Sequence, residues 1–302
     1  MNVRSSLAAA VLLGISLFLA GCFGSPEAAT EEETERSEEA LGHRAVRRPT
    51  TRDAKVLIVV SAADFIWVEE RDTGRIRKTP AGYFLSELGF PLARLVETGG
   101  KITFASPGGV APTMDRVSDS PSLLYYKSAS EYRAIRDLVT SQPGMQHPEK
   151  LEELTDAELE GFDALFIPGG HAPMTDLAKS PAMARVLRHF HENAKPTGSL
   201  CHGPAAFLAA QPFPYAGYRM TALSDGEEQL QELMNVYDTN VRLTWYVERD
   251  LRAAGADYER NFLKFTSRVV TDRELVTGQN PQSARAVGVA FTNKVADFVD
   301  GR

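Results

Sequence analysis

PTGSLCHGPAAFL, residues 196–208, is the stretch that indicates both the fold and the chemistry of this chain. Residues 197–200 have the pattern of a short buried strand, and an apolar helical segment begins at Gly203. A cysteine at a sharp turn from strand to helix holds its sulfur clear of both elements, which is the geometry of a nucleophile elbow. The helix N-terminus behind Cys201 would favour the thiolate, and Gly198 leaves room for a tight backbone crossing. We therefore predict that Cys201 is a nucleophile; the alternative is a structural cysteine packed inside a parallel sheet.

The composition is typical of a globular protein with a large core. The chain has 302 residues, of which 43% are hydrophobic and 24% are charged, and its formal net charge is −7. No basic stripe stands out after residue 53, which argues against a nucleic-acid partner.

The first residues resemble a bacterial lipoprotein signal peptide. Arg4 precedes an apolar run at residues 7–19, which is too short for a comfortable membrane-spanning helix. The run ends in the tetrapeptide LAGC at residues 19–22. We therefore expect removal of residues 1–21 and lipidation of Cys22; the alternatives are an ordinary secretory signal and a retained membrane anchor.

This signal predicts where the protein lies and how the chain is organised. The protein would be held at the cell envelope by its lipid, facing the periplasm or the outside. Lipidation of Cys22 would leave Cys201 as the one thiol of the mature chain, and so without a disulfide partner. Residues 22–53 carry an acidic run and then a basic run with little to bury, so we predict a disordered tether. One globular domain is predicted at residues 54–302.

From residue 54 onward, predicted strands and helices alternate. Apolar runs predict buried strands, in chain order, at 56–62, 101–106, 165–168 and 197–200. Helical spacing predicts helices at 82–98, 128–139, 183–190 and 283–299, and a strand pair at 268–277 precedes the last of them. The alternation predicts an α/β fold with a parallel doubly wound sheet, and residues 110–160 predict a small cap over its edge.

Two features of this sheet point to residues beside Cys201. The carboxyl ends of parallel strands meet at one edge, so Gly169 and Gly170, which end the 165–168 strand, are expected near the thiol. A backbone N–H there would meet a developing oxyanion; a glycine turn without such a role is the alternative. No spacing of His, Cys, Asp and Glu indicates a metal site.

Glu87 is harder to place from the pattern. It lies at the inward edge of the 82–98 helix, and its neighbours alone favour a carboxylate that reaches solvent. Pro91, four residues later, cannot donate to the carbonyl of Glu87, so we predict a kink in this helix.

Four segments, in this order, resemble the ThiJ/PfpI superfamily: FDALFIPGGHAPMTDL, KPTGSLCHGPAAFL, GYRMTALSDGEEQ and LVTGQNPQSA. They are most similar to its branch of glyoxalase III enzymes, which work without glutathione, and of stress-induced holding chaperones. The likeness covers nearly everything from residue 55 and implies a flavodoxin-like α/β/α sandwich. The chain departs from the branch at Ala172-Pro173, where several members have Gly after the His, and in its lipid anchor, because most characterised relatives are cytoplasmic.

The resemblance also implies roles for individual residues. The nucleophile falls on Cys201, and the glutamate that bonds its sulfur falls on Glu87, against the pattern. The family His falls on His202, and its acidic partner on Glu228, with Asp225 as the nearby alternative. Oxyanion contacts fall on the backbone of Gly170 and His202, with Gly169 beside them and His171 at the pocket wall.

Such a member would be a lyase of the D-lactate dehydratase type, converting a small aldehyde such as methylglyoxal to lactate without a metal or an organic cofactor. Whether the chain forms a homodimer is left open by the sequence. A class I amidotransferase needs a His well downstream of its nucleophile, and none of the six His follows His202. A peptidase of this superfamily usually depends on assembly into a ring. The serious alternative is an envelope chaperone in which Cys201 senses oxidants.

Overall fold

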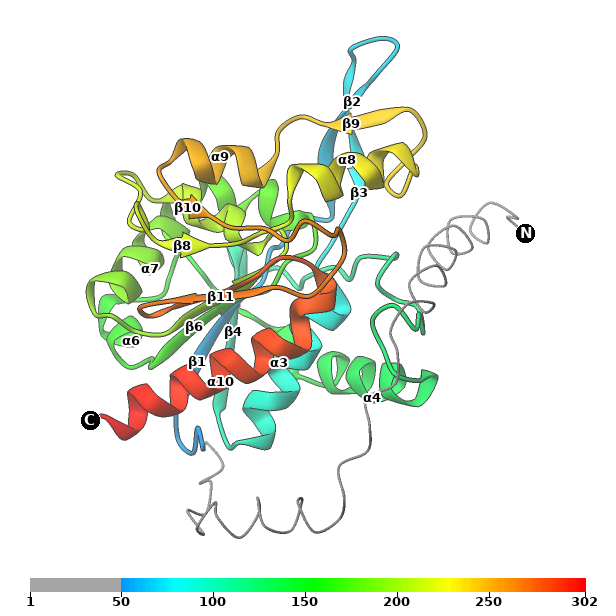
Figure 1. The fold of residues 1–302 in the computed structure, drawn as a ribbon. Helices are drawn as coiled ribbons and strands as arrows, with labels where there is room; N and C mark the ends of the chain where they lie inside the picture. The colour runs from blue at the N-terminus through cyan, green and yellow to red at the C-terminus, as the bar shows by residue number, and fades with distance from the viewer. Residues whose placement is uncertain (1–49) are drawn as a thin grey trace, which may run out of the picture. The chain divides into compact units, whose positions relative to one another are not determined.

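The computed structural model describes residues 50–302, and a seven-stranded sheet runs through this region (Figure 1). Its order is β11-β12-β7-β6-β1-β4-β5. All neighbours are parallel except the hairpin of β11 and β12. The strands are β1 (Lys55–Val59), β4 (Lys101–Ser106), β5 (Glu149–Lys150), β6 (Ala164–Ile167), β7 (Thr197–Leu200), β11 (Val269–Asp272) and β12 (Leu275–Gly278). The predicted signal peptide and Cys22 lie outside the described residues.

Helices cover both faces of the sheet, so its central strands are buried on both sides. In β1, Val56 and Ile58 pack in one core cluster, whereas Leu57 and Val59 pack in the other. The first cluster lies under α3 (Leu85–Glu97), α4 (Ala129–Thr140) and α10 (Ala284–Asp300); the second lies under α6 (Asp156–Glu160), α7 (Pro181–Glu192) and α9 (Val247–Ala253). The two clusters confirm the predicted α/β/α sandwich.

Glycines let the layers approach closely at two places. At Gly198 of β7, an added Cβ would lie 2.6 Å from the ring of Phe291 and 2.7 Å from the ring of Phe166, so only glycine fits between these rings. At Gly288 of α10, an added Cβ would lie 3.1 Å from the Cα of Pro91. Helix α3 is continuous from Leu85 to Glu97 across Pro91, where the sequence predicts a kink.

A second, smaller sheet projects from the sandwich, above the carboxyl ends of its central strands (Figure 1). It has the antiparallel order β3-β2-β9, with β2 (Phe65–Glu70), β3 (Ile76–Pro80) and β9 (Val241–Leu243). The sequence analysis did not predict this sheet. The excursion that it did predict at 110–160 contributes α4, the short α5 (Pro143–Gln146), α6 and the edge strand β5.

The C-terminal half completes the framework of the site. Helix α8 (Asp225–Leu233) begins shortly after β8 (Arg219–Met220). This strand pairs with β10 (Asp257–Tyr258) in a two-stranded sheet. The hairpin predicted at 268–277 is confirmed by the antiparallel pairing of β11 and β12.

Packing on the domain begins before residue 54. Thr51 is fully buried; its N–H donates to the carbonyl of Thr98 at 3.1 Å, and the two hydroxyls lie 2.7 Å apart. The range predicted as a tether therefore includes at least one residue that packs on the domain.

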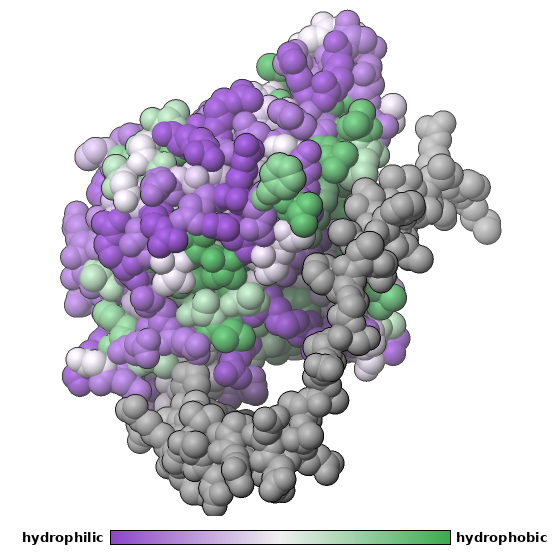
Figure 2. Space-filling view, in the orientation of Figure 1, coloured by the Kyte–Doolittle hydropathy of each residue, from purple (hydrophilic) through white to green (hydrophobic). Residues whose placement is uncertain are grey.

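The visible surface is mostly polar. Figure 2 shows hydrophilic side chains over most of one face, with apolar groups scattered among them. Phe262 is 99% exposed, and Leu233 and Leu263 are also exposed. No helix within residues 50–302 is long and apolar enough to cross a membrane.

Candidate active site

Cys201 occupies the tip of the turn between β7 and the 3-10 helix η5 (Gly203–Ala209). Its φ of +56° lies in the left-handed region, which non-glycine residues rarely adopt. Backbone hydrogen bonds of 2.9 Å hold it there, from its N–H to Gly278 and from the N–H of Leu223 to its carbonyl. The turn confirms the predicted elbow, although the helix behind the cysteine is a 3-10 helix.

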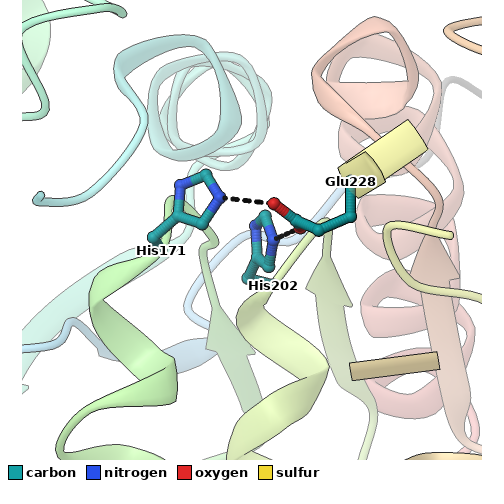
Figure 3. Close-up of side chains that lie close together, drawn as sticks. All are labelled: His171, His202 and Glu228. Carbon is teal, nitrogen blue, oxygen red and sulfur yellow. Dashed lines mark hydrogen bonds and ion pairs between the residues drawn. The ribbon is translucent and has the colours of Figure 1, made fainter. Parts of the chain in front are cut away.

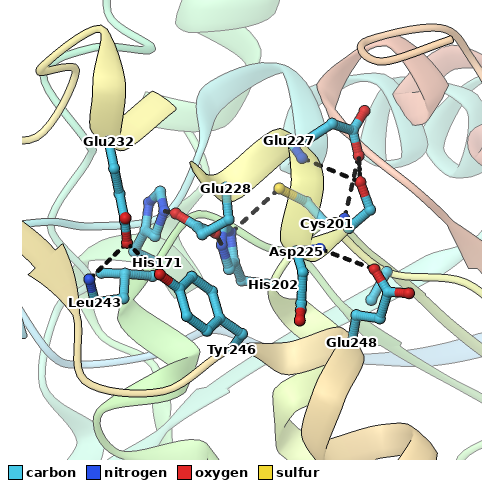
Figure 4. Close-up of polar contacts among 12 residues, drawn as sticks. His171, Cys201, His202, Asp225, Glu227, Glu228, Glu232, Leu243, Tyr246 and Glu248 are labelled. Atoms are coloured by element: carbon cyan, nitrogen blue, oxygen red, sulfur yellow. Dashed lines mark hydrogen bonds and ion pairs between the residues drawn. The ribbon is translucent and has the colours of Figure 1, made fainter. Parts of the chain in front are cut away.

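A continuous chain of polar contacts runs from the thiol of Cys201 to a buried carboxylate (Figure 4). The Sγ of Cys201 lies 3.3 Å from Nδ1 of His202, and Nε2 of His202 lies 2.6 Å from Oε2 of Glu228. All three side chains are buried. Because Nε2 faces the carboxylate, it carries the proton, which leaves Nδ1 free to accept from the thiol.

Glu228, and not Asp225, is the carboxylate that reaches His202. The backbone N–H of Asp225 donates to Glu248 at 2.8 Å, and the Asp225 side chain faces Arg249, 3.7 Å away. Of the two acidic residues that the resemblance left open, the structure therefore brings only Glu228 to the imidazole.

The start of α8 fixes the direction of Glu228. Ser224 caps this helix and forms a capping box with Glu227. Glu227 also accepts hydrogen bonds from Gln279, Asn280 and the N–H of Phe265, which anchors it away from the thiol. Because these hydrogen bonds hold Glu227 on one side of the helix, the next residue, Glu228, points to His202 (Figure 4).

Glu87 is fully buried beside the thiol, although its neighbours in sequence favour solvent. The N–H of Gly170 donates to its Oε2 at 3.0 Å. A Cβ added to Gly169 would lie 2.3 Å from that oxygen and 2.9 Å from the Cβ of Cys201, so these groups adjoin. The structure therefore places Glu87 where the resemblance implied. The N–H of Gly170, which was predicted to contact an oxyanion, donates to the carboxyl group of Glu87 instead.

Burial and mutual repulsion disfavour charge on both groups. Burial raises the pKa of Glu87 to about 8, against weaker opposing hydrogen bonds from Cys201 and the glycine amides. Burial, and after it Glu87, raises the pKa of the Cys201 thiol well above its ordinary value. The prediction that the elbow favours a thiolate does not hold in this arrangement. The thiol must lose its proton as it reacts, and His202 lies in place to accept it.

The electrostatics of His202 and Glu228 suit a base and its partner. Burial, and then His171, lower the pKa of His202, so the imidazole is neutral near pH 7 and can accept a proton. Burial opposes the charge of Glu228, but the two histidines outweigh it and hold the pKa of this carboxyl below its ordinary value. Glu228 therefore stays ionised and stabilises the imidazolium that forms.

Further residues close the site, and only His171 among them was named from the sequence. Nε2 of His171 lies 3.4 Å from Oε1 of Glu228 (Figure 3). Tyr237 donates its hydroxyl to the same oxygen, and its ring stands edge-on to His171, with centroids 4.5 Å apart. Asp115 is buried near Glu87, and burial raises its pKa. Neither Tyr237 nor Asp115 lies in a pattern that sequence reasoning uses.

The arrangement suits addition of a thiol to a carbonyl carbon. The sulfur is presented at an elbow, an adjacent imidazole accepts its proton, and a carboxyl group that is neutral near pH 7 lies on hand for the developing oxyanion.

Comparisons with known proteins agree with this architecture. Residues 81–294 match the DJ-1/PfpI family. The protein/nucleic acid deglycase HchA of Escherichia coli is 34% identical over 148 residues, which cover 47% of this chain and 50% of the relative. The chain thus spans about half the length of the curated relatives it matches.

Two crystal structures show the same fold. The Rapid Encystment Protein of 24 kDa from Francisella tularensis has a TM-score of 0.64 at 22% identity, over 80% of this chain and 99% of that one. Glyoxalase III from Candida albicans has a TM-score of 0.59 at 22% identity, over 79% of this chain and 95% of that one. With the family match over most of the described residues and with this fold, the chain belongs to the DJ-1/PfpI family.

Proposed function

We propose that the chain is a glyoxalase III-like enzyme that converts 2-oxoaldehydes such as methylglyoxal to 2-hydroxy acids such as lactate, without glutathione. The observation that carries this proposal is the chain of contacts from Cys201 through His202 to Glu228, with Glu87 beside the thiol. The similarity to a protein/nucleic acid deglycase of Escherichia coli and to glyoxalase III of Candida albicans adds support.

The first step is addition of the thiol to the aldehyde carbon. A carbon–sulfur bond forms, the proton of the thiol passes to Nδ1 of His202, and the carbonyl oxygen takes up the electron pair. Glu87, which is protonated near pH 7, donates to that oxygen, and Glu228 stabilises the imidazolium. The product is a hemithioacetal on Cys201.

The second stage moves hydrogen between two carbons. The carboxylate left on Glu87 removes the proton from the carbinol carbon, and the His202 imidazolium protonates the neighbouring carbonyl oxygen to give an enediol. Glu87 then returns its proton to the second carbon while the hydroxyl on the first carbon loses its proton to His202, which gives the lactoyl thioester. Water then hydrolyses the thioester to lactate and returns the proton to sulfur. One carbon is oxidised as its neighbour is reduced, so methylglyoxal and water account for all atoms and electrons.

A deglycase is the second candidate, because the relative matched at 34% identity carries that name. Its substrate would be a methylglyoxal adduct of an amine, guanidine or thiol, in which a hemiaminal-type carbon takes the place of the free aldehyde. The same sulfur would attack that carbon, and the amine would leave instead of staying bound.

One assay separates the two candidates. The full chain is incubated without glutathione, first with free methylglyoxal and then with purified, methylglyoxal-modified N-acetylarginine from which free aldehyde has been removed. Lactate from the first substrate at the higher kcat/KM supports the glyoxalase; faster release of N-acetylarginine from the second supports the deglycase. Cys201→Ser should abolish either activity, and Glu87→Gln should reduce it by at least about 100-fold. Turnover that survives Cys201→Ser would contradict both.

We also propose that the enzyme acts at the cell envelope. The support is the LAGC tetrapeptide at residues 19–22, after the apolar run that begins at residue 7. A lipid-anchored enzyme there would meet aldehydes outside the cytoplasm.

A further inference from the structure

Three potential metal ligands converge at one point of the site. His171, His202 and Glu228 each offer one ligand atom, and these atoms lie within 4.8 Å of one another. They come from the turn after β6, the elbow after β7 and the first turn of α8, and all three are buried. Figure 3 shows both imidazoles turned toward the same carboxylate. No spacing in the sequence indicates this cluster, because 57 positions separate His171 from Glu228.

The reaction proposed above accounts for only one of the two histidines. His202 lies between the thiol and Glu228, as a base must. His171 does not contact the sulfur, yet its Nε2 faces Oε1 of the same carboxylate at 3.4 Å, and the two imidazole centroids are 3.8 Å apart. The second imidazole takes no proton from Cys201 itself, and with His202 and Glu228 it completes a different donor set.

Two histidines and one carboxylate are the ligands of many zinc and ferrous sites that keep open positions. The two carboxyl oxygens of Glu228 face the two imidazoles, one each, at 3.4 Å from Nε2 of His171 and 2.6 Å from Nε2 of His202. The polar side chains that contact it are His171, His202 and Tyr237, so no cationic lysine or arginine of the described residues competes at its oxygens. We propose that His171, His202 and Glu228 bind a divalent transition-metal ion of the Zn²⁺ type, and that the metal-bound form is an inactive state of the enzyme.

The inactivity follows from the two edges of the His202 ring. In the metal-free state Nε2 carries the proton and Nδ1 accepts from the thiol. A metal ion on Nε2 takes the place of that proton, and the neutral ring then carries its proton on Nδ1. The N–H at Nδ1 faces the sulfur and cannot accept a proton from the thiol. The proton only moves from one ring nitrogen to the other, so none is released, and the base needed for addition to the aldehyde is lost.

The test measures metal binding directly and does not depend on turnover. Zn²⁺ is titrated into the metal-free full chain in competition with a chromophoric chelator. We expect one Zn²⁺ per chain. His171→Gln should weaken binding at least about 10-fold, since loss of even an outer partner of a ligand has that effect. At the same Zn²⁺ concentration, the melting temperature of the wild-type chain should rise more than that of the variant.

Two control variants separate this site from ordinary thiol or surface binding. His191→Gln removes a histidine that pairs with Glu274 at 3.0 Å on another part of the domain, and should leave the affinity unchanged. Cys201→Ser should also keep most of the affinity, because the sulfur faces Nδ1 and not Nε2. Loss of binding in Cys201→Ser with full binding in His171→Gln would overturn the proposal.

If His171→Gln does not fold, the absorption spectrum of bound Co²⁺ tests the ligand set in its place. Co²⁺ bound to the unchanged chain should give visible ligand-field bands without the near-ultraviolet band of a cobalt–thiolate bond. A strong thiolate band, or no uptake of Zn²⁺ or Co²⁺, would refute the site. Failure of the glyoxalase assay with intact Zn²⁺ binding would refute the proposed function and leave this site standing.

Discussion

The carboxyl group of Glu87 and the thiol of Cys201 share one buried space, where a second negative charge is costly. The resting arrangement of lowest free energy is a neutral carboxyl beside a neutral thiol, with Glu228 ionised on the far side of His202. Reactivity then depends on His202 being a neutral acceptor at the moment of attack. The resting site therefore holds a neutral thiol, and the thiolate forms only when His202 accepts the proton during the attack.

Glu87 should make stability depend on pH. Because its pKa is raised from 4.5 to about 8, the folded chain holds a proton there that the unfolded chain releases. Between these values the free energy of unfolding should fall as pH rises, by up to about 1.4 kcal/mol per pH unit. Glu87→Gln cannot ionise and should flatten this slope in urea unfolding at about pH 5, 6.5 and 8. The control Ser86→Ala, a buried neighbour on α3, should keep it. An unchanged slope in Glu87→Gln would mean that Glu87 does not titrate in this window.

Glu228 and Asp225 should differ sharply in their effect on turnover. Glu228→Gln removes the charge that stabilises the His202 imidazolium, so kcat should fall at least about 100-fold. Asp225→Asn leaves the contact with His202 intact and should stay within a few-fold of the unchanged chain. Steady-state kinetics with methylglyoxal measure both. Equal losses in the two variants would contradict the assignment of the base's partner.

At the scale of elements, two strands of the main sheet follow the sequence most closely. The ranges predicted for β4 and β7 are those observed, because Pro and Gly bound each apolar run. The 3-10 form of η5 and the sheet of β2, β3 and β9 were not predicted. β2 mixes exposed and buried residues, and it pairs with β9 about 170 positions away, which no local pattern reveals.

Buried polar groups escaped prediction for the same reason. The carboxyl group of Glu87 is held inside by the amide of Gly170, which is 83 positions away. Without the family resemblance, its helical neighbours indicate solvent. Tyr237 likewise depends on a contact with Glu228 across a turn without periodicity. The local sequence thus indicated the elbow, whereas long-range contacts determined which polar side chains surround it.

Replacement of Gly198 should test the packing of β7 against α10. An alanine Cβ would lie 2.6 Å from the ring of Phe291, so we expect Gly198→Ala to lower the free energy of unfolding by about 1–3 kcal/mol. The matched control is Gly226→Ala in α8, where the new Cβ would meet only the end of the flexible Lys264 side chain, at 3.1 Å. Denaturant midpoints of the two variants give the comparison. A stable Gly198→Ala would mean that the layers separate without loss.

The start of the packed region should also be measurable. A chain that begins at Ala54 lacks Thr51, which is buried and bonds to Thr98. We expect it to melt several degrees below a chain that begins at Pro49, since a loss of about 1 kcal/mol lowers Tm by roughly 2–4 °C in a domain of this size. Turnover should be equal below both transitions. Equal melting temperatures would place the functional boundary at residue 54, as the sequence predicts.

At the scale of the whole molecule, the proposed lipid anchor would determine in which compartment the proposed enzyme meets its substrate. Cys22→Ser should remove lipidation and either release the protein to the soluble periplasmic fraction or leave an uncut precursor. Fractionation with mass spectrometry of the N-terminal peptide measures this. An unmodified Cys22 in membrane-bound protein would refute the anchor.

The left-handed backbone conformation at Cys201 lowers the stability of the fold at the residue that carries the reactive thiol. Asn and especially Gly are the residues that tolerate a φ of +56°, and a side chain such as that of Cys costs about 1 kcal/mol there. Under selection for stability alone, replacement by glycine would be an improvement, while any such change would remove the sulfur. A descendant that had lost its substrate should therefore drift away from cysteine at this position. In a lineage that keeps cysteine at this position, selection for the thiol's reaction still exceeds selection for stability.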